Sequence, residues 1–130
     1  MGQPAAKQGD QITAIDTHIV IDSSSGSPLS LPHPFAGIIS DGLSSDVNIM
    51  GKPAAVQGSK AKNNPPHIPT SPGVSFQKPP SNEGTIQMGS QTVKINGKPA
   101  ARNGDTAMTC NDPTDQAVGK VIAVGTVNIG

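Results

Sequence analysis

A nine-residue pattern, G-x-P-A-A-x-x-G-[DS], occurs three times in the chain and constrains its fold more than any other feature. The copies occupy residues 2–10, 51–59 and 97–105, so they begin 49 and 46 residues apart. Internal repeats of this length indicate that a fold is built from equivalent supersecondary units that pack against one another. The alternative, that each P-A-A segment is an unremarkable loop, does not explain three copies in register.

Short strands are expected directly before two of the copies, at Val47–Ile49 and Val93–Ile95, because each has β-branched residues on one face. No residues are available for such a strand before the first copy, but a similar segment stands at the other end of the chain, at residues 126–130. If this C-terminal strand completes the first repeat, the two termini meet. The sequence therefore predicts one domain, residues 1–130, closed as three units around a pseudo-threefold axis.

The composition of the motif predicts a tight turn and a close approach of backbones. Proline sets φ for the turn, and the paired alanines allow backbones to come together near an axis. Gly9, Gly58 and Gly104 are expected to adopt a backbone conformation that other residues avoid.

The rest of the composition favours an all-β fold with few large side chains. Glycine and proline number 15 and 13, two phenylalanines are the only aromatic residues, and long helices are excluded because a helix breaker falls in nearly every window. Residues 12–22 have strand-like content, with Ile15 and Ile19 on one face and Asp16 and His18 on the other. Residues 118–127 also resemble a strand, and the Pro-rich residues 60–91 are expected to form a long ordered loop.

The charge pattern and the short apolar stretches exclude two classes of partner, nucleic acid and the membrane interior. Nine basic residues balance nine acidic ones without a dense basic run, so nucleic acid is not an expected partner. The apolar stretches fall far short of the ~20 residues that a spanning helix needs, so stable membrane insertion is not expected either.

The chain contains three histidines and one cysteine, a set that matches the complete ligand shell of one tetrahedral zinc ion. His18 and His67 each follow the last glycine of a repeat motif by nine residues, and Cys110 follows Gly104 by six. Equivalent loops on a threefold body converge at one end, and His33, between two prolines, is expected to supply the fourth ligand. No local metal-binding spacing is present, so the alternative remains that these histidines are ordinary surface or core residues, and iron or cobalt would also accept such ligands.

A structural role for such an ion is favoured over a catalytic one, and no catalytic residue is assigned. Four protein ligands leave no position for water, and the only glutamate, Glu83, lies in the Pro-rich segment rather than beside a histidine. Zinc binding contributes roughly 10–16 kcal/mol in small peptides, which would offset the scarcity of large apolar side chains.

Residues 99–102 read P-A-A-R, and the other two copies depart from this only in the fourth residue. With this spacing and number of copies, the chain resembles the PAAR-repeat proteins. The resemblance is carried by Pro4, Ala5, Ala6, Pro53, Ala54, Ala55, Pro99, Ala100, Ala101 and Arg102.

The resemblance implies a small pointed β cone with zinc near its apex, held by His18, His33, His67 and Cys110. It also implies a non-enzymatic spike-tip protein of a contractile injection machine, such as a type VI secretion system or a phage tail-like particle. One tip caps and sharpens each trimeric spike, a VgrG-like protein or a phage spike β-helix, for membrane puncture. Such a protein is made in the bacterial cytoplasm without a signal peptide and leaves the cell with the particle on firing.

Two alternative functions remain open. The first is an adaptor that loads effector proteins onto the spike through the Pro-rich loop, Pro65–Pro80, a role that is compatible with the tip. The second, less favoured, is a zinc-dependent hydrolase that acts as an effector.

Overall fold

The computed structural model describes residues 2–130, which are all-β and contain no helix; Met1, the first residue of the expected domain, lies outside the described residues. The all-β class predicted from the sequence is confirmed. The strands are β1 (Gln3–Pro4), β2 (Gln11–Asp22), β3 (Pro28–Asp41), β4 (Asn48–Ile49), β5 (Lys52–Pro53), β6 (Lys60–Asn63), β7 (Gly73–Phe76), β8 (Glu83–Ile86), β9 (Lys94–Ile95), β10 (Lys98–Pro99), β11 (Thr106–Thr109), β12 (Gln116–Ile122) and β13 (Asn128–Ile129).

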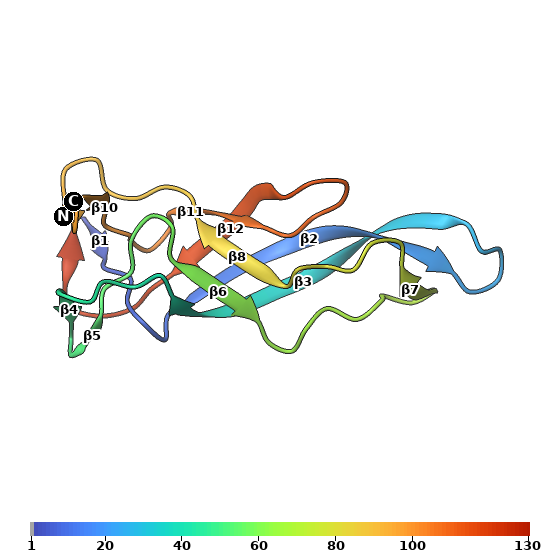
Figure 1. Cartoon of the computed structure of the whole chain (residues 1–130), viewed down its shortest axis with the longest axis horizontal. Helices are drawn as coiled ribbons and strands as arrows, with labels where there is room; N and C mark the ends of the chain where they lie inside the picture. The colour runs from blue at the N-terminus through green and yellow to red at the C-terminus, as the bar shows by residue number, and fades with distance from the viewer. Residues whose placement is uncertain (1) are drawn as a thin grey trace.

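Six strands close into a small antiparallel barrel in the order β12-β11-β8-β6-β3-β2, with β12 pairing back onto β2. The barrel consists of three hairpins, β2–β3, β6–β8 and β11–β12, and each hairpin follows one copy of the repeat motif. The first hairpin is much longer than the others and extends beyond the barrel, where β7 pairs with the end of β2. The molecule is therefore a cone whose narrow end is the β2–β3 hairpin (Figure 1).

The broad end of the cone carries three two-stranded ribbons, β4–β5, β9–β10 and β1–β13. In the third ribbon the C-terminal strand pairs antiparallel with β1, with Gln3 opposite Ile129. The two termini consequently lie side by side at the broad end (Figure 1). The strand β13 occupies in the first repeat the place that β4 and β9 occupy in the other two.

The alanines of the motif form a closed ring of hydrogen bonds around the axis of the cone. The N–H of Ala6 donates to the carbonyl of Ala101 at 2.9 Å, Ala101 donates to Ala55 at 3.0 Å, and Ala55 donates back to Ala6 at 3.0 Å. All three side chains are buried, and a larger residue would not fit where three backbones meet. This ring makes the three repeats structurally equivalent.

The turn after the alanines is also equivalent in the three repeats. Gly9, Gly58 and Gly104 have φ of 94°, 95° and 89°, so the predicted positive-φ conformation is confirmed. The side chain that follows each glycine then accepts a hydrogen bond from the backbone N–H three residues earlier. These acceptors are Asp10 (3.0 Å), Ser59 (3.0 Å) and Asp105 (2.7 Å).

The interior above the alanine ring holds aliphatic side chains, from alanine to isoleucine, from all three hairpins together with Phe35. The large Phe35 ring fits because Gly37 leaves space beside it: a Cβ at that position would lie 2.9 Å from the ring. Beyond Phe35 the inward face of β2 carries the polar residues Asp16 and His18 and then the buried Val20.

Two expectations about individual segments differ from the structure. Residues 60–91, expected to be a long loop, contain β6, β7 and β8. These strands are four residues each and lack a clear alternation, and the prolines of the segment lie in the connections between them. The alternative of a surface position for His18 is wrong, because Asp16 and His18 point inward and are buried, whereas Ile15 on the other face is 60% exposed.

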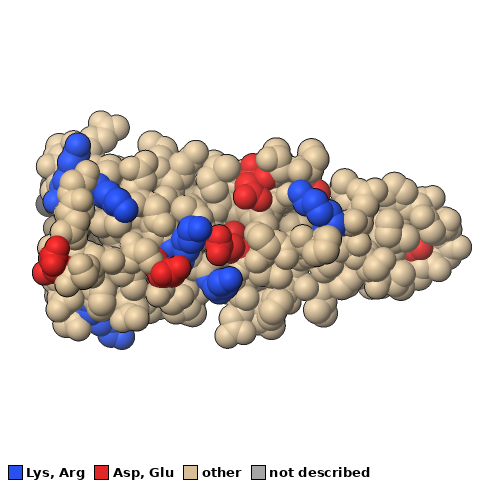
Figure 2. All heavy atoms as spheres, viewed as in Figure 1, with Lys and Arg blue, Asp and Glu red and all other residues tan. Residues whose placement is uncertain are grey.

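The charged side chains are unevenly distributed along the cone. No Lys or Arg occurs between Lys7 and Lys52, the stretch that forms the long β2–β3 hairpin. On the face shown in Figure 2, the narrow end accordingly carries no basic side chain. None of the residues described, 2–130, belongs to a helix long and apolar enough to cross a membrane.

Candidate metal centre

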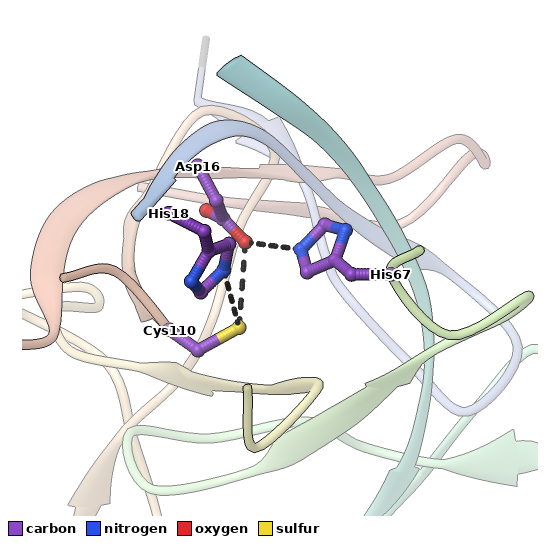
Figure 3. Close-up of side chains that lie close together, drawn as sticks. All are labelled: Asp16, His18, His67 and Cys110. Atoms are coloured by element: carbon purple, nitrogen blue, oxygen red, sulfur yellow. Dashed lines mark hydrogen bonds and ion pairs between the residues drawn. The ribbon is translucent and has the colours of Figure 1, made fainter. Parts of the chain in front are cut away.

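Four side chains with metal-binding atoms meet inside the cone, where the barrel narrows toward the long hairpin: Asp16, His18, His67 and Cys110 (Figure 3). Asp16 and His18 are two residues apart on the inward face of β2. His67 lies in the connection after β6, and Cys110 directly follows β11. Each of the three hairpins thus supplies at least one donor, which is the convergence that equivalent arms on a threefold body predict.

The donor atoms are close enough to share one ion. All four lie within 4.8 Å of one another. The Sγ of Cys110 is 3.6 Å from Nε2 of His18 and 3.5 Å from Oδ2 of Asp16, and Nε2 of His67 is 2.9 Å from the same carboxylate oxygen. Zinc bonds of about 2.0–2.3 Å put tetrahedral donors about 3.3–3.8 Å apart, so small side-chain movements bring these atoms to that spacing.

The buried carboxylate of Asp16 is the member of the cluster that most needs a compensating positive charge. It is fully buried, and its Oδ1 accepts hydrogen bonds from Oγ1 of Thr109 at 2.5 Å and from Nδ2 of Asn111 at 3.4 Å. No Lys or Arg within residues 2–130 forms an ion pair with it, and its partner is the imidazole of His67, itself a candidate ligand, at 2.9 Å. A buried carboxylate is stable only when it is paired, bonded to a metal or protonated, so the group fits a bound cation.

His33, which the sequence places in the ligand set, lies beside the cluster without being one of its four members. Its ring centre is 5.4 Å from that of His18 and 5.6 Å from that of His67. Its Nδ1 is 2.9 Å from the carbonyl of Leu31, and its Nε2 accepts the N–H of Thr70 at 3.2 Å. Nε2 therefore faces the Pro-rich segment, and the ligand role of His33 stays a prediction.

Both phenylalanines of the chain pack against these histidines and exclude water from the cluster. The ring of Phe76 lies 5.7 Å from His18 and 5.4 Å from His33, and Phe35 lies 6.0 Å from His67. Burial lowers the pKa of His18, with a further contribution from the nearby His67. Burial lowers the pKa of His33 as well, so these two imidazoles are in the neutral form that binds metals.

The thiol of Cys110 is held in its protonated form by the same surroundings. Burial raises its pKa above the ordinary value, and the carboxylate of Asp16 raises it further. Metal binding at this site therefore releases the thiol proton, because the thiolate is the ligand form. When bound, the ion supplies a cross-link between the three hairpins.

Two residues of the site were missed by the reasoning from sequence. Asp16 shares the inward face of β2 with His18, and that alternation was visible in the sequence. Asp112 is buried behind His18, with its Oδ2 at 3.5 Å from Nδ1 of the imidazole. Nothing in the local sequence distinguishes this aspartate from an ordinary turn residue.

Cys110, His18 and Asp112 lie next to one another in that order, an arrangement that resembles a catalytic triad of thiol, base and orienting carboxylate. Nucleophilic catalysis needs an accessible thiolate of lowered pKa, however. Cys110 is 2% exposed and burial raises the pKa of its thiol. The geometry therefore suits a closed metal site better than a reactive cysteine.

The family comparison agrees with this geometry. Residues 77–129, which contain the third copy of the repeat and β13, match the family model described as the PAAR motif. A comparison with curated proteins gave no match. With its three copies of the motif arranged around one axis, the chain is similar to the PAAR-repeat proteins of contractile injection systems, and the match over residues 77–129 supports this family.

Proposed function

We propose that this chain is the non-enzymatic tip of a contractile injection machine, where it caps a trimeric spike and sharpens it for membrane puncture. The observation that carries the proposal is the pseudo-threefold broad end. Only a body with three equivalent faces can make three similar contacts with a partner that has true threefold symmetry. The ring of alanine hydrogen bonds shows that the three repeats are equivalent in their backbone as well as in their sequence.

The broad end also carries apolar side chains at equivalent positions. Val47, Val93 and Val127 are 37%, 36% and 41% exposed. The carbonyl of each accepts the N–H of the first alanine in its neighbouring motif, at 2.9, 3.0 and 2.8 Å. Their positions are thus fixed by the repeat, and burying three such side chains on a spike trimer would contribute about 1–2 kcal/mol each.

The opposite end is suited to penetration. It is a hairpin of two long strands that pair over eleven registered residue pairs from Gln11–Ile38 to Ile21–Pro28. The candidate metal centre lies at the base of this hairpin, so a bound ion would tie it to the other two repeats. A continuous ladder of backbone hydrogen bonds resists bending under the axial load of sheath contraction.

A test uses substitutions on the broad end. Replacing Val47, Val93 and Val127 together with aspartate should abolish co-purification with the trimeric spike protein, because three charges would be buried at the contact. Ile68→Asp, at an exposed position remote from the broad end, is the matched control and should bind the spike normally. Retention of the spike by the triple variant would contradict docking through this face.

An adaptor role for the Pro-rich segment is a second candidate, favoured by one observation. A cavity of about 530 Å³ lies between β3 and residues 63–71, lined by prolines and by the 77% exposed Ile68. Ile68→Asp should then reduce effector loading while spike binding is unchanged. Val118→Asp, at an exposed position outside the Pro-rich segment, is the control for an added surface charge.

A further inference from the structure

Asp112 and His18 face each other on the side of the imidazole that is turned away from the metal-binding atoms. Nε2 of His18 lies 3.6 Å from the sulfur of Cys110, inside the cluster. The other ring nitrogen, Nδ1, lies 3.5 Å from Oδ2 of Asp112. The two side chains are 1% and 4% exposed, so water does not compete for this contact.

Each of these two side chains has one polar atom without a hydrogen bond. For Asp112 that atom is Oδ1, which lies 3.7 Å from Nζ of Lys78, whereas Oδ2 is the oxygen that faces His18. Among residues 2–130, Nδ1 of His18 and Oδ1 of Asp112 are the fully buried side-chain nitrogen and oxygen atoms that have no hydrogen-bond partner. A neutral imidazole carries one N–H. Placed on Nδ1, that proton points at a carboxylate, whereas placed on Nε2 it would leave the Nδ1 lone pair facing a carboxylate oxygen.

The backbone around Asp112 holds its carboxylate in this position. The N–H of Asp112 donates to the carbonyl of Thr17 at 2.8 Å, and Oδ2 of Asp112 accepts the N–H of Ile19 at 2.9 Å. The side chain of Asn111 accepts the N–H of Thr17 at 2.6 Å. Asn111 and Asp112 are therefore hydrogen-bonded to Thr17 and Ile19, the two residues of β2 that flank His18.

We propose that Asp112 is a positioning residue of the metal centre. It holds His18 in the tautomer that has the proton on Nδ1, so that the lone pair of Nε2 points at the position shared by Cys110, His67 and Asp16. Histidines that bind metals commonly donate their second N–H to a carboxylate in this way, and loss of the carboxylate typically weakens metal binding 10- to 100-fold.

The substitution Asp112→Asn separates this role from a purely structural one. An asparagine that keeps its amide oxygen on the N–H of Ile19 offers Nδ1 of His18 only an uncharged oxygen, and one that turns the other way places its NH₂ group against Nδ1 and favours the wrong tautomer. Either orientation loses the carboxylate charge that favours a proton on Nδ1. We expect the Kd for Zn²⁺, measured by competition with a chelator, to rise 10- to 100-fold while the far-UV circular dichroism of the metal-free chain is unchanged. Asp115→Asn, an exposed aspartate of the same loop with the same change of charge, should keep the Kd of the unsubstituted chain.

A Kd for Asp112→Asn equal to that of the unsubstituted chain would overturn the proposal. A second measurement decides the matter even if the variant does not fold. Long-range ¹H–¹⁵N spectra of the unsubstituted, metal-free chain should show His18 with its proton on Nδ1, and a proton on Nε2 would refute the proposal. Neither measurement involves a spike protein, so this inference and the proposed function can fail separately.

Discussion

Asp105 offers a direct test of the turn that each repeat motif forms. Its Oδ2 accepts the backbone N–H of Arg102 at 2.7 Å, and its Oδ1 pairs with Nη2 of the same residue at 2.9 Å. Asp105→Ala removes both interactions. Asp105→Ser removes the ion pair alone, because in the second repeat Ser59 accepts the equivalent N–H, that of Val56, at 3.0 Å.

The expected losses follow from these contacts. An unpaired backbone N–H costs about 1–3 kcal/mol, and a partly exposed ion pair contributes about 0.5–1 kcal/mol. Asp105→Ala should therefore lower the free energy of unfolding by about 1.5–4 kcal/mol, and Asp105→Ser by about 0.5–1 kcal/mol. At about 3–4 °C per kcal/mol for a chain of this size, the first variant should lose roughly 5–16 °C in Tm and the second roughly 2–4 °C.

The assay is thermal and urea unfolding of the three proteins at one fixed concentration of free Zn²⁺, since a bound ligand shifts the apparent stability. Equal destabilisation by alanine and serine would refute the reasoning, because it would mean that the hydrogen bond to the backbone contributes nothing. A loss below about 0.5 kcal/mol for Asp105→Ala would refute it as well.

Three further predictions concern the metal centre. The pKa of His18 and of His33 is lowered on folding, so below about pH 6.5 the unfolded metal-free chain binds more protons than the folded one. The free energy of unfolding should therefore fall as the pH is lowered from about 6.5 and stay level between about pH 6.5 and pH 8. Urea titrations across this range measure it, and a stability that rose on acidification would contradict the burial argument. Cys110→Ser should lower the bound zinc, measured by plasma emission, and the Tm together, and an unchanged Tm after complete loss of metal would contradict a structural ion. Asp16→Asn should weaken zinc binding more than His33→Gln if the four clustered side chains are the ligands, and the reverse order in chelator competition would favour His33 as the fourth ligand.

The repeats could be interpreted from the sequence because the information in them is local. Small residues at Ala5 and Ala6, a proline before them and a glycine after them are required by the backbone at each copy, so the pattern predicts the turn and the axis directly. The all-β cone follows from three such units and from the absence of helix-forming stretches. These predictions needed no knowledge of what lies across the barrel.

The long hairpin and the inner face of β2 could not be derived in the same way. No strand was predicted for residues 28–41, yet Pro32 and Pro34 both lie in β3, which pairs with β6 only from Gly37 onward and leaves its tip-side edge free for residues without an N–H. The alternation in β2 separates Asp16 and His18 from Ile15, but it does not say which face is inside. That choice depends on donors from the other two repeats, which are distant in sequence.

Some features of the candidate ligands could be predicted from the local sequence, and others depend on contacts across the barrel. His18 and His67 stand at the same distance from their repeat glycines, yet one lies within a strand and the other in a connection, because β6 ends at Asn63. Their rings nevertheless meet, with centres 5.0 Å apart. The repeat spacing predicted this convergence. The alternation in β2 placed Asp16 beside His18 without showing that this face points inward, and nothing in the sequence indicated Asp112.

Native mass spectrometry of the chain mixed with its trimeric spike protein and Zn²⁺ tests the central claim most directly. Docking through a pseudo-threefold base predicts a complex of one tip chain with three spike chains, and its mass should include one zinc ion. Three tip chains on each spike trimer, or a tip that assembles as a homotrimer on its own, would contradict the account.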